Sequence, residues 1–517
     1  MLTLKLERSG SDTLQRQIFS QVRDAILTGR LAPGSELPAS RLLASQYSVS
    51  RNTVLQAYEW LTSEGYLETQ RGTRTFVSLN LPEHCLLVDR SVNHRDPDSP
   101  RGVPKTPVLF QGERPGLFET GPNKPKIDFW PGRPNRAYFP LFAIRKLFLE
   151  NLASAARAFT EYGDAGGMHE LRAAIARHLD VARGFQVEPS QILITSGIQE
   201  ALNIVARLFI KSGTPVGVEN PCYNSAALIF LSYGATLTPI EVDRDGMRVD
   251  TIGGLKSRLI YVTPSHQFPT GVTLSLERRL RLLEWAQNTG AYLLEDDYDS
   301  DFRYFGPPLT ALAGLDTGRS VIYLGTFSKS IGAGLRTGFL VVPPQLVEPA
   351  MTVKVLLNYG HPWAEQALLA DFLNSRSYQR HLRKIRRAYS GVRDYLLEEL
   401  KKAFGEVDIW GAETGMHVMW RLPKGFPTAQ EFAAATRAYN IKIHTLETAG
   451  TYDMASPYGA DSIILGYSAL TRQEIKAGVQ AMEKALVDLG FAAGLERDRR
   501  RGRDSAGNDG LKVLTNG

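Results

Sequence analysis

The lysine of the stretch GTFSKS, Lys329, follows directly after the apolar strand pattern Val321–Leu324. In an open α/β sheet, ligands bind beyond the carboxyl ends of the strands, which is where this pattern places the lysine. Its hydroxylic neighbours Thr326 and Ser328 can hydrogen-bond phosphate oxygens, and Arg336 can clamp a phosphate with two parallel hydrogen bonds. A lysine by itself is most often solvated, so the prediction of a phosphate-bearing ligand depends on the other motifs of the chain.

A second motif is the acidic stretch LLEDDYDSDFRY, in which Asp296 ends another apolar strand pattern. A carboxylate at that place can keep the nitrogen of a pyridine ring protonated, which makes the ring an electron sink. Tyr298 can hydrogen-bond a phenolic oxygen of the same ring. The alternative is a calcium loop, but the stretch lacks the glycine and the distal glutamate of an EF-hand loop. The motif therefore favours a ring-binding carboxylate, and we expect no metal ion.

Three further motifs each follow an apolar strand pattern. In ITSGIQEAL, a turn at Gly197 precedes a helix that starts near Ile198, so the amides at its N-terminus can receive a phosphate. In ENPCYNSA, Tyr223 can stack on a flat ring. In VTPSHQFPTGV, a turn can bring His266 toward the same ring. A glycine turn before a helix is common, so these motifs carry weight through their number and order.

The elements that must position these residues alternate between short apolar strands and amphipathic helices from residue 126 to residue 490. The strand patterns are QILIT, TPVGVE, RLIYVT, AYLLE and SVIYLG, each followed by glycine, proline or polar residues. This alternation predicts an α/β fold with a mostly parallel central sheet, helices on both faces, and a smaller C-terminal lobe.

Residues 1–78 have a different pattern, in which short helices precede a small hairpin. The first helix carries a single apolar stripe with a four-residue spacing, made of Leu14, Ile18, Val22 and Ile26. The second helix is expected to pack through Leu42, Leu43 and Tyr47. In the third helix, Val54, Tyr58 and Leu61 form the predicted buried side.

The third helix begins at Ser50, whose hydroxyl can accept an amide hydrogen bond as an N-cap. Polar side chains and free amides at that exposed end suit phosphates and base edges in a major groove of DNA. Tyr66–Thr69 and Thr73–Val77 can pair as a wing with Arg71 at its tip. The alternative for this part of the chain is a small helical cap with a solvated polar face.

The two parts together resemble a known family. LAPGSELPASRLLA, VSRNTV, AYEWLTSEGYLE and RGTRTFV are similar to the winged helix-turn-helix of the GntR family, over nearly all of residues 12–78. YGDAGGMHELR, ITSGIQEAL, TPSHQFPTGV, EDDYDSDFRY and GTFSKS resemble, in the expected order, the fold-type I aminotransferases and specifically the MocR/GabR-like regulators.

The resemblance implies a transcription regulator that binds double-stranded DNA and pyridoxal 5'-phosphate (PLP). The implied DNA contacts are Arg41, Ser50, Arg51, Asn52, Thr53, Arg71 and Gly72. Lys329 would form the internal aldimine, Asp296 would pair with the pyridine nitrogen, Tyr298 would bind the phenolate oxygen, and Tyr223 would stack on the ring. The residues implied around the phosphate are Gly197, Ile198, Thr326, Ser328 and Arg336. The resemblance also implies a head-to-tail homodimer.

The chain departs from its relatives in the groups that would bind a substrate carboxylate. Phe268 stands where classical aminotransferases have an asparagine that binds the phenolate oxygen. Ile464 stands where the usual carboxylate-binding arginine should be, and Ser225 where some GABA-responsive members have an arginine. An unpaired buried charge is costly. Either the effector is not an ordinary α-amino acid or GABA, or Arg133 or Arg136 binds its carboxylate.

Composition sets limits on the class of protein. The chain has 43% hydrophobic and 22% charged residues and a net charge of +6, which suits a globular protein and is compatible with nucleic-acid binding. Its two cysteines, Cys85 and Cys222, imply neither a disulfide framework nor a zinc site. Without an apolar leader or a long apolar run, we expect a cytoplasmic protein.

We predict four regions: a DNA-binding domain at 1–78, a proline-containing linker at 79–125, an aminotransferase-like domain at 126–490, and a disordered charged tail at 491–517. Two functions fit them. The first is a regulator whose aminotransferase-like domain senses an amine or amino-acid effector through an aldimine on Lys329. The second is an active aminotransferase with an accessory DNA-binding domain, in which Lys329 is the general acid and base.

Overall fold

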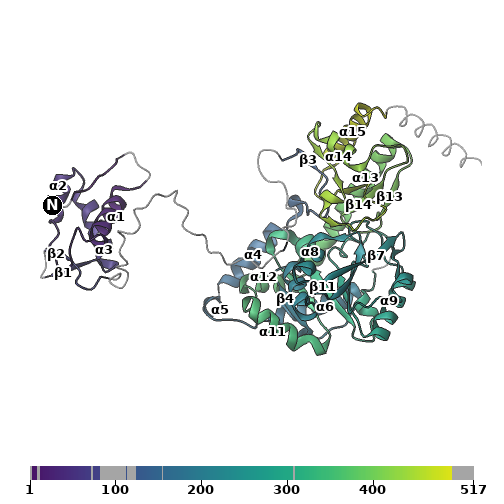
Figure 1. Ribbon diagram of the computed structural model, residues 1–517, viewed down its shortest axis with the longest axis horizontal. Helices are drawn as coiled ribbons and strands as arrows, with labels where there is room; N and C mark the ends of the chain where they lie inside the picture. Colours follow the sequence, from purple (N-terminus) through teal and green to yellow (C-terminus); the bar gives the residue numbers. More distant parts are fainter. Residues whose placement is uncertain are drawn as a thin grey trace, which may run out of the picture. The chain divides into compact units, whose positions relative to one another are not determined.

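The computed structural model describes residues 3–8, 12–70, 74–81, 112, 124–153, 155–306 and 309–491. The chain divides into two compact units, Met1–Pro107 and Val108–Gly517, and each unit is described here by itself (Figure 1).

The first unit is built on three helices and a two-stranded hairpin. Helix α1, Leu14–Leu27, begins at Thr13, whose side chain accepts a hydrogen bond from the amide of Arg16. Its apolar stripe buries Ile18, Val22 and Ile26, as the four-residue spacing predicts. The stripe packs into the core that α1 shares with α2, Ser40–Gln46, and α3, Arg51–Ser63.

The burial of α2 and α3 follows the expected sides with one exception. In α3, Val54, Tyr58 and Leu61 are buried, which confirms that prediction. In α2, Leu43 is fully buried, but Leu42 is 63% exposed, so the prediction that Leu42 packs this helix is wrong. The helix has only seven residues and buries a single face, which has room for Leu43 and Ala44.

The hairpin after α3 forms as the sequence predicts. Strands β1, Leu67–Gln70, and β2, Arg74–Val77, pair antiparallel, with Leu67 opposite Val77 and Gln70 opposite Arg74. The loop between them, which carries the predicted DNA contacts Arg71 and Gly72, lies outside the described residues.

The second unit is organised around an eight-stranded sheet in the order β4-β12-β11-β10-β9-β5-β7-β8. The strands are Ile192–Thr195 (β4), Pro215–Asn220 (β5), Thr236–Asp243 (β7), Gly246–Met247 (β8), Leu259–Val262 (β9), Tyr292–Asp296 (β10), Val321–Thr326 (β11) and Gly338–Val341 (β12). The pairs from β11 through β7 are parallel, whereas β12 runs antiparallel to both its neighbours and β8 to β7. The mostly parallel sheet is confirmed.

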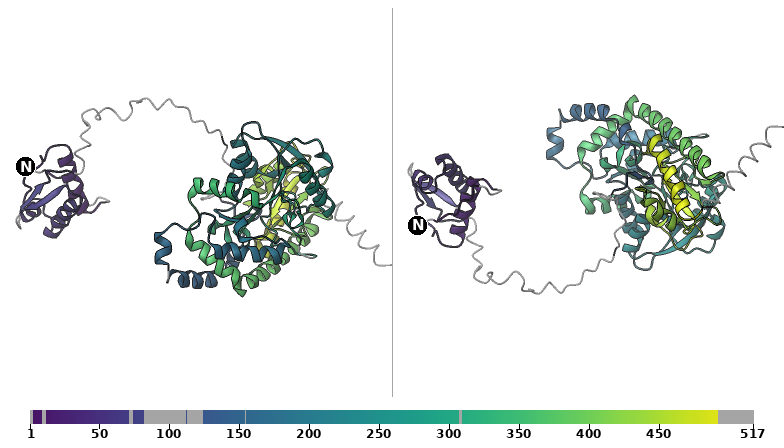
Figure 2. Two further views of the ribbon diagram at one scale, coloured as in Figure 1. Left: turned by 90° about the horizontal axis from the view of Figure 1, so that it is seen from below. Right: turned by 90° about the horizontal axis from the view of Figure 1, so that it is seen from above.

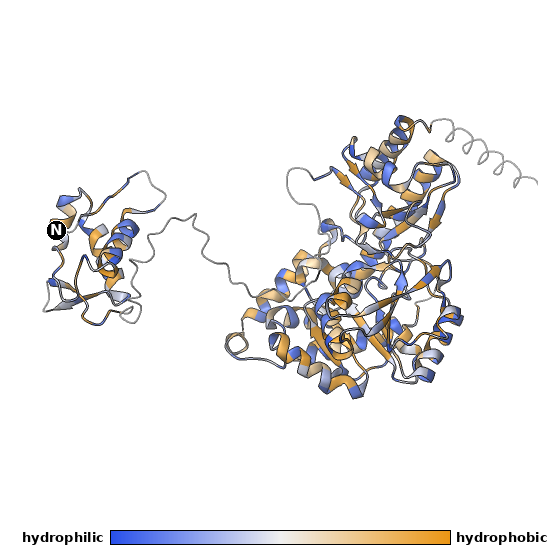
Figure 3. Ribbon diagram, viewed as in Figure 1, coloured by the Kyte–Doolittle hydropathy of each residue, from blue (hydrophilic) through white to orange (hydrophobic). Residues whose placement is uncertain are grey.

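Helices cover both faces of this sheet, as the two views of Figure 2 show. One face packs against α6 (His169–Arg183), α9 (Leu276–Thr289) and α12 (Trp363–Asn374); the other packs against α7 (Ile198–Phe209), α8 (Asn224–Ser232) and α11 (Val347–Asn358). Alternate residues of one strand therefore enter different cores: Ile192 and Ile194 enter the first, and Leu193 the second. This two-sided burial explains the almost continuous apolar strand patterns, seen as hydrophobic colours in Figure 3.

The smaller lobe of this unit has an antiparallel sheet in the order β13-β14-β18-β16. Its strands are Asp408–Trp410 (β13), His417–Arg421 (β14), His444–Thr445 (β16) and Ser462–Gly466 (β18). The lobe also contains α14, Ala429–Arg437, and α15, Arg472–Asp488, and the long helix α13, Arg376–Phe404, packs against α15.

Within the described part of the chain, no helix has the length and apolar character to cross a membrane. Most of the predicted linker and all but one residue of the predicted tail lie outside the described residues, so those boundaries stay predictions.

Candidate functional site

Lys329 lies one turn beyond the end of β11, in a short π-helix, Ser328–Gly332. Its amine donates a hydrogen bond to the carbonyl oxygen of Gly132 over 3.0 Å. A side chain at position 132 would put its Cβ 2.8 Å from the lysine nitrogen. Glycine at this position therefore keeps the space next to the amine open, and it brings the stretch FWPGRPNR to the site.

Burial lowers the pKa of Lys329, and the nearby carboxylates Asp299 and Asp296 oppose this shift only in part. A lysine whose pKa is lowered is uncharged for more of the time, and only the uncharged amine is a nucleophile. The surroundings of Lys329 therefore favour covalent chemistry at its nitrogen.

Asp296 ends β10, the strand next to β11, so the two residues emerge at the same edge of the sheet. Its Oδ2 atom accepts a hydrogen bond from the hydroxyl of Tyr261 over 2.7 Å. Its Oδ1 atom is buried and has no hydrogen-bond partner among the described residues. Burial raises the pKa of Asp296 to about 7. Because unsatisfied buried acceptors are rare, this oxygen is suited to a ligand N–H donor.

The other acidic residues of this motif have structural partners. Glu295 accepts hydrogen bonds from the amides of Leu312 and Ala313, both at 2.8 Å. Asp297 pairs with Arg183 at 2.7 Å. Asp299 and Asp301 contact His266 and His178 respectively. In this motif, therefore, the other acidic residues are engaged in structural contacts, and only Asp296 keeps a buried carboxylate oxygen available. The motif is not a calcium loop.

Three of the predicted phosphate-binding residues, Gly197, Ile198 and Arg336, meet at the N-terminus of α7. Gly197 precedes the helix with φ at +77°, a conformation that glycine adopts most readily. The guanidinium of Arg336 donates to the carbonyl oxygen of Ser196 over 3.2 Å, and it would lie 3.1 Å from a Cβ added at Gly197. The hydroxyls of Thr326 and Ser328, two residues that precede Lys329 closely in the sequence, lie 3.0 Å apart. The cation and the helix amides can receive an anion here.

An aromatic group surrounds Phe268, the residue that replaces an asparagine. Its ring stands edge-on to Tyr223 at 5.9 Å, to Tyr298 at 6.2 Å and to His417 at 5.5 Å. Gln199 on α7 donates to the hydroxyl of Tyr223 over 3.2 Å. The structure thus brings the predicted residues Tyr223 and Tyr298 together on one side of the site.

His266 is buried beside Tyr298. Its Nδ1 lies 2.8 Å from a carboxylate oxygen of Asp299 and 3.0 Å from the Tyr298 hydroxyl, so it supports that tyrosine. The ring of His417 lies 4.6 Å from that of His266 and is tilted by 49°, and burial lowers the pKa of His417 well below its usual value. His266, Asp299 and His417 are close enough to hold a metal ion, but hydrogen bonds already engage Asp299 and one nitrogen of each ring. Sequence reasoning did not find the roles of Asp299 and His417, because both depend on tertiary contacts.

The two positions where relatives have a carboxylate-binding arginine carry buried, uncharged residues. Ile464 on β18 is fully buried, and it stands between Met419 of β14 and His444 of β16 in the sheet. It belongs to an apolar cluster that includes Val272. Ser225 is also buried, near the start of α8. Neither position provides a cation.

Four of the predicted DNA-contact residues, Ser50, Arg51, Asn52 and Thr53, lie at the N-terminus of α3. Ser50 is its N-cap and accepts a hydrogen bond from the amide of Thr53 over 3.1 Å. Arg51 and Asn52 are exposed in the first turn, and Arg41 is exposed on α2. This arrangement leaves basic and amide groups available at the start of a helix.

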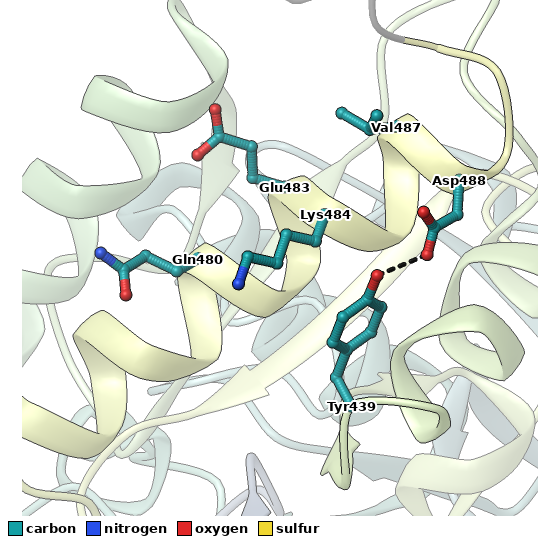
Figure 4. Close-up of a pocket in the computed structure, with 6 residues that line it drawn as sticks. All are labelled: Tyr439, Gln480, Glu483, Lys484, Val487 and Asp488. Carbon is teal, nitrogen blue, oxygen red and sulfur yellow. Dashed lines mark hydrogen bonds between the residues drawn. The ribbon is translucent and has the colours of Figure 1, made fainter.

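A separate surface hollow of about 480 Å³ lies along α15 (Figure 4), and it contains none of the predicted site residues. Its lining residues are Tyr439, Gln480, Glu483, Lys484, Val487 and Asp488, with the Tyr439 hydroxyl donating to Asp488. It has no feature that connects it to Lys329.

Comparison with protein families matches both parts of the chain. Residues 14–77 match bacterial regulatory proteins of the gntR family, and residues 134–481 match aminotransferase class I and II.

The chain is similar to whole proteins with the same two parts. It is 34% identical to the uncharacterized HTH-type transcriptional regulator YhdI of Bacillus subtilis, over 94% of this chain and 99% of that protein. It is 33% identical to the probable rhizopine catabolism regulatory protein MocR of Rhizobium meliloti, over 96% and 98%. The crystal structure of Pyrococcus horikoshii kynurenine aminotransferase in complex with PMP has a TM-score of 0.64 and 27% identity, covering 70% of this chain and 91% of that one.

These likenesses imply pyridoxal 5'-phosphate as the cofactor. The residues present fit it: Lys329 offers an amine of lowered pKa, the unsatisfied Oδ1 of Asp296 offers an acceptor, and Arg336 lies against the N-terminus of α7.

Proposed function

Because the chain belongs to the MocR-type transcriptional regulators of the GntR family, with a GntR helix-turn-helix and an aminotransferase class I and II domain, we propose that it senses a primary amine at Lys329 and regulates transcription in response. We place this regulatory activity in the cytoplasm, because a bacterial regulator binds its operator DNA there.

The observation that carries the sensing role is the buried Oδ1 atom of Asp296, which has no hydrogen-bond partner among the described residues, at the edge of the sheet where Lys329 also emerges. A buried carboxylate oxygen without a donor is unfavourable in the protein alone. A cofactor whose ring carries an N–H group would donate a hydrogen bond to this oxygen and remove that penalty. This explains why an aspartate is suited to the position.

When bound, pyridoxal 5'-phosphate supplies a carbonyl carbon that reacts with primary amines, and a ring that can accept electrons. Lys329 would hold the cofactor through its amine nitrogen. Asp296 would keep a proton on the ring nitrogen, and Tyr298, which contacts His266, would bind the ring oxygen. Arg336, Thr326, Ser328 and the amides after Gly197 would hold the phosphate.

The DNA-binding role is assigned to the first unit, with α3 in the major groove and the loop between β1 and β2 as the wing. A ligand shifts a protein between two states only if it binds them with different affinities. The amine must therefore bind one of two states of the protein more tightly than the other. We expect the resulting shift to change the affinity of the protein for operator DNA.

We also propose that the chain forms a homodimer. Apolar side chains are strongly exposed on α4 (Leu141–Leu152), at α5 (Ala156–Thr160) and on α11. The exposed residues are Leu141, Phe142, Leu149, Phe159, Tyr162, Leu356 and Tyr359. Exposed apolar groups that gather in this way are typical of an interface, and a second copy of the chain is the partner that we expect.

The proposed function is tested by replacing Lys329 with alanine. The wild-type protein should be yellow, and borohydride should fix the cofactor covalently on Lys329, as peptide mapping would show. The Lys329→Ala protein should have no fixed cofactor, should bind operator DNA, and should no longer change its operator affinity when amines are added. A cofactor fixed on another lysine would contradict the assignment.

The same preparation separates the regulator from an active aminotransferase. Steady-state turnover of amino donors with a keto acid should be negligible, whereas amine addition should change operator binding. Rapid turnover without any effect on DNA binding would favour the enzyme.

A further inference from the structure

We propose that the amine sensed at Lys329 carries uncharged hydroxyl groups at its far end, and that Arg133 and Asp128 together recognise them. This inference rests on the proposed sensing function and names the class of its ligand: an amino alcohol or amino polyol, rather than an amino acid.

The first step is the position of Arg133. The carbonyl of Gly132 accepts the hydrogen bond from Lys329 over 3.0 Å, and Arg133 is the next residue in the chain. The Arg133 side chain is partly exposed, at 27%. Of the two arginines that could replace a missing carboxylate clamp, Arg133 directly follows the residue that contacts the amine, whereas Arg136 is exposed on a separate 3₁₀ turn, Arg136–Tyr138.

The second step is that Arg133 is already matched by an anion. Its guanidinium lies 2.9 Å from Oδ2 of Asp128, and Oδ1 of Asp128 lies 2.8 Å from Nε2 of His444. Burial disfavours the ionised form of Asp128, but the hydrogen bonds and charges of His444 and Arg133 outweigh it and lower the pKa of Asp128. Asp128 is therefore a carboxylate at neutral pH.

The third step is that a donor and an acceptor stand side by side. A ligand carboxylate can only accept hydrogen bonds. If it approached Arg133, it would be repelled by the negative charge of Asp128, which already lies within hydrogen-bond distance of the same guanidinium. A hydroxyl group both accepts and donates. It can accept from Arg133 and donate to Asp128 at once, without a charge conflict.

The residue paired with His444 adds no positive charge. In the small-lobe sheet, His444 is paired with Ile464, which is fully buried in an apolar cluster where aminotransferases have their arginine. The ring of Trp130 stands edge-on to His444 at 5.0 Å. Apolar and aromatic neighbours of this kind give a carboxylate no compensating charge.

The experiment is a spectral titration of the full-length, cofactor-loaded protein with amines matched in length. The pairs are 3-aminopropan-1-ol with β-alanine and 4-aminobutan-1-ol with GABA, and 2-amino-1,3-propanediol is added as a diol. We expect the half-saturating concentration of each alcohol to be lower than that of its carboxylate by at least about tenfold, because like charges placed together oppose binding.

Asp128→Asn is the decisive variant, because it removes the negative charge and leaves the guanidinium in place. The preference should move toward β-alanine and GABA by about tenfold or more, and Arg133→Gln in the same background should abolish that gain. Asp461→Asn, which breaks a similar ion pair with Arg421 at 2.6 Å in the small lobe, is the matched control and should leave all titrations unchanged.

Carboxylates that bind the wild-type protein as well as or better than the alcohols would overturn this inference and leave amine sensing intact. An unchanged preference in Asp128→Asn would also overturn it. If no amine changes the spectrum of a protein whose cofactor is fixed on Lys329 by borohydride, the sensing function itself fails, and this inference fails with it.

Discussion

At the scale of single residues, the burial of Asp296 suits it to bind a ring nitrogen but disfavours its ionised form. In its proposed role the carboxylate is buried where it can pair with a ring nitrogen, and burial raises its pKa to about 7 from its usual value of 3.8. The folded protein without cofactor therefore binds a proton more tightly at this residue than the unfolded chain does. The stability that this proton contributes is fully present below pH 3.8 and is lost as the pH rises through 7.

Asp296→Asn should therefore stabilise the cofactor-free protein at pH 8, by up to about 4 kcal/mol, because a shift of one pKa unit corresponds to about 1.4 kcal/mol. The gain should shrink toward pH 5, where the wild-type carboxyl is protonated. The same variant should bind the cofactor more weakly. Denaturant unfolding of the cofactor-free proteins at pH 5 and pH 8 measures this, with the partly exposed Asp243→Asn as control. A gain that is equal at both pH values would contradict the explanation.

At the scale of elements, the N-terminus of α3 is organised for contact rather than for packing. Its buried side, Val54, Tyr58 and Leu61, fixes the helix in the core of the first unit. Ser50 caps the helix and leaves Arg51 and Asn52 exposed in the first turn. A helix anchored on one side and polar at its start is the geometry that a major groove accepts.

Arg51→Ala should weaken operator binding and leave the absorbance of the cofactor unchanged. A lost phosphate contact should reduce the slope of log affinity against log salt by about 1, and a lost base contact should cost about 1–3 kcal/mol with relaxed sequence preference. Arg16→Ala is the matched control, since Arg16 is an exposed arginine on α1 with 64% exposure. Equal losses in the two variants, measured by fluorescence anisotropy over a salt series, would show that the start of α3 is only a solvated surface.

At the scale of the whole molecule, the exposed apolar residues of the second unit require a cover. Phe142 on α4 is 86% exposed and Leu149 is 57% exposed, while the rings of Tyr162 and Tyr359 lie 5.6 Å apart. Large apolar side chains at such exposures are unfavourable in water. The proposed homodimer removes them from water.

The double variant Phe142→Lys and Leu149→Lys should shift the protein from dimer to monomer in light scattering coupled to size-exclusion chromatography, because each lysine would have to be desolvated in the interface. Leu276→Lys with Leu280→Lys on α9 is the matched control, with 62% and 52% exposure at the original leucines. This control should remain dimeric. A dimer that survives the first pair of substitutions would place the interface elsewhere.

The sequence by itself determined the order of elements and the proposal of most cofactor residues. Strands buried on both faces give continuous apolar patterns, and Lys329 and Asp296 stand directly after two of them, so their meeting at one edge of the sheet follows from the parallel arrangement. In the same way, the periodicity of α1 and α3 and the N-cap at Ser50 indicated the helix-turn-helix.

Tertiary structure alone decided which partners complete each group. The two members of each of the pairs Tyr261 and Asp296, Gly132 and Lys329, and His444 and Asp128 are distant from each other in the chain. The same holds for Leu42, which local periodicity placed in the core, although α2 has only one side to bury. Periodicity reports which face of an element is apolar, but hydrogen-bond partners and the state of a charge depend on what the fold brings within a few ångströms, and no local pattern encodes that.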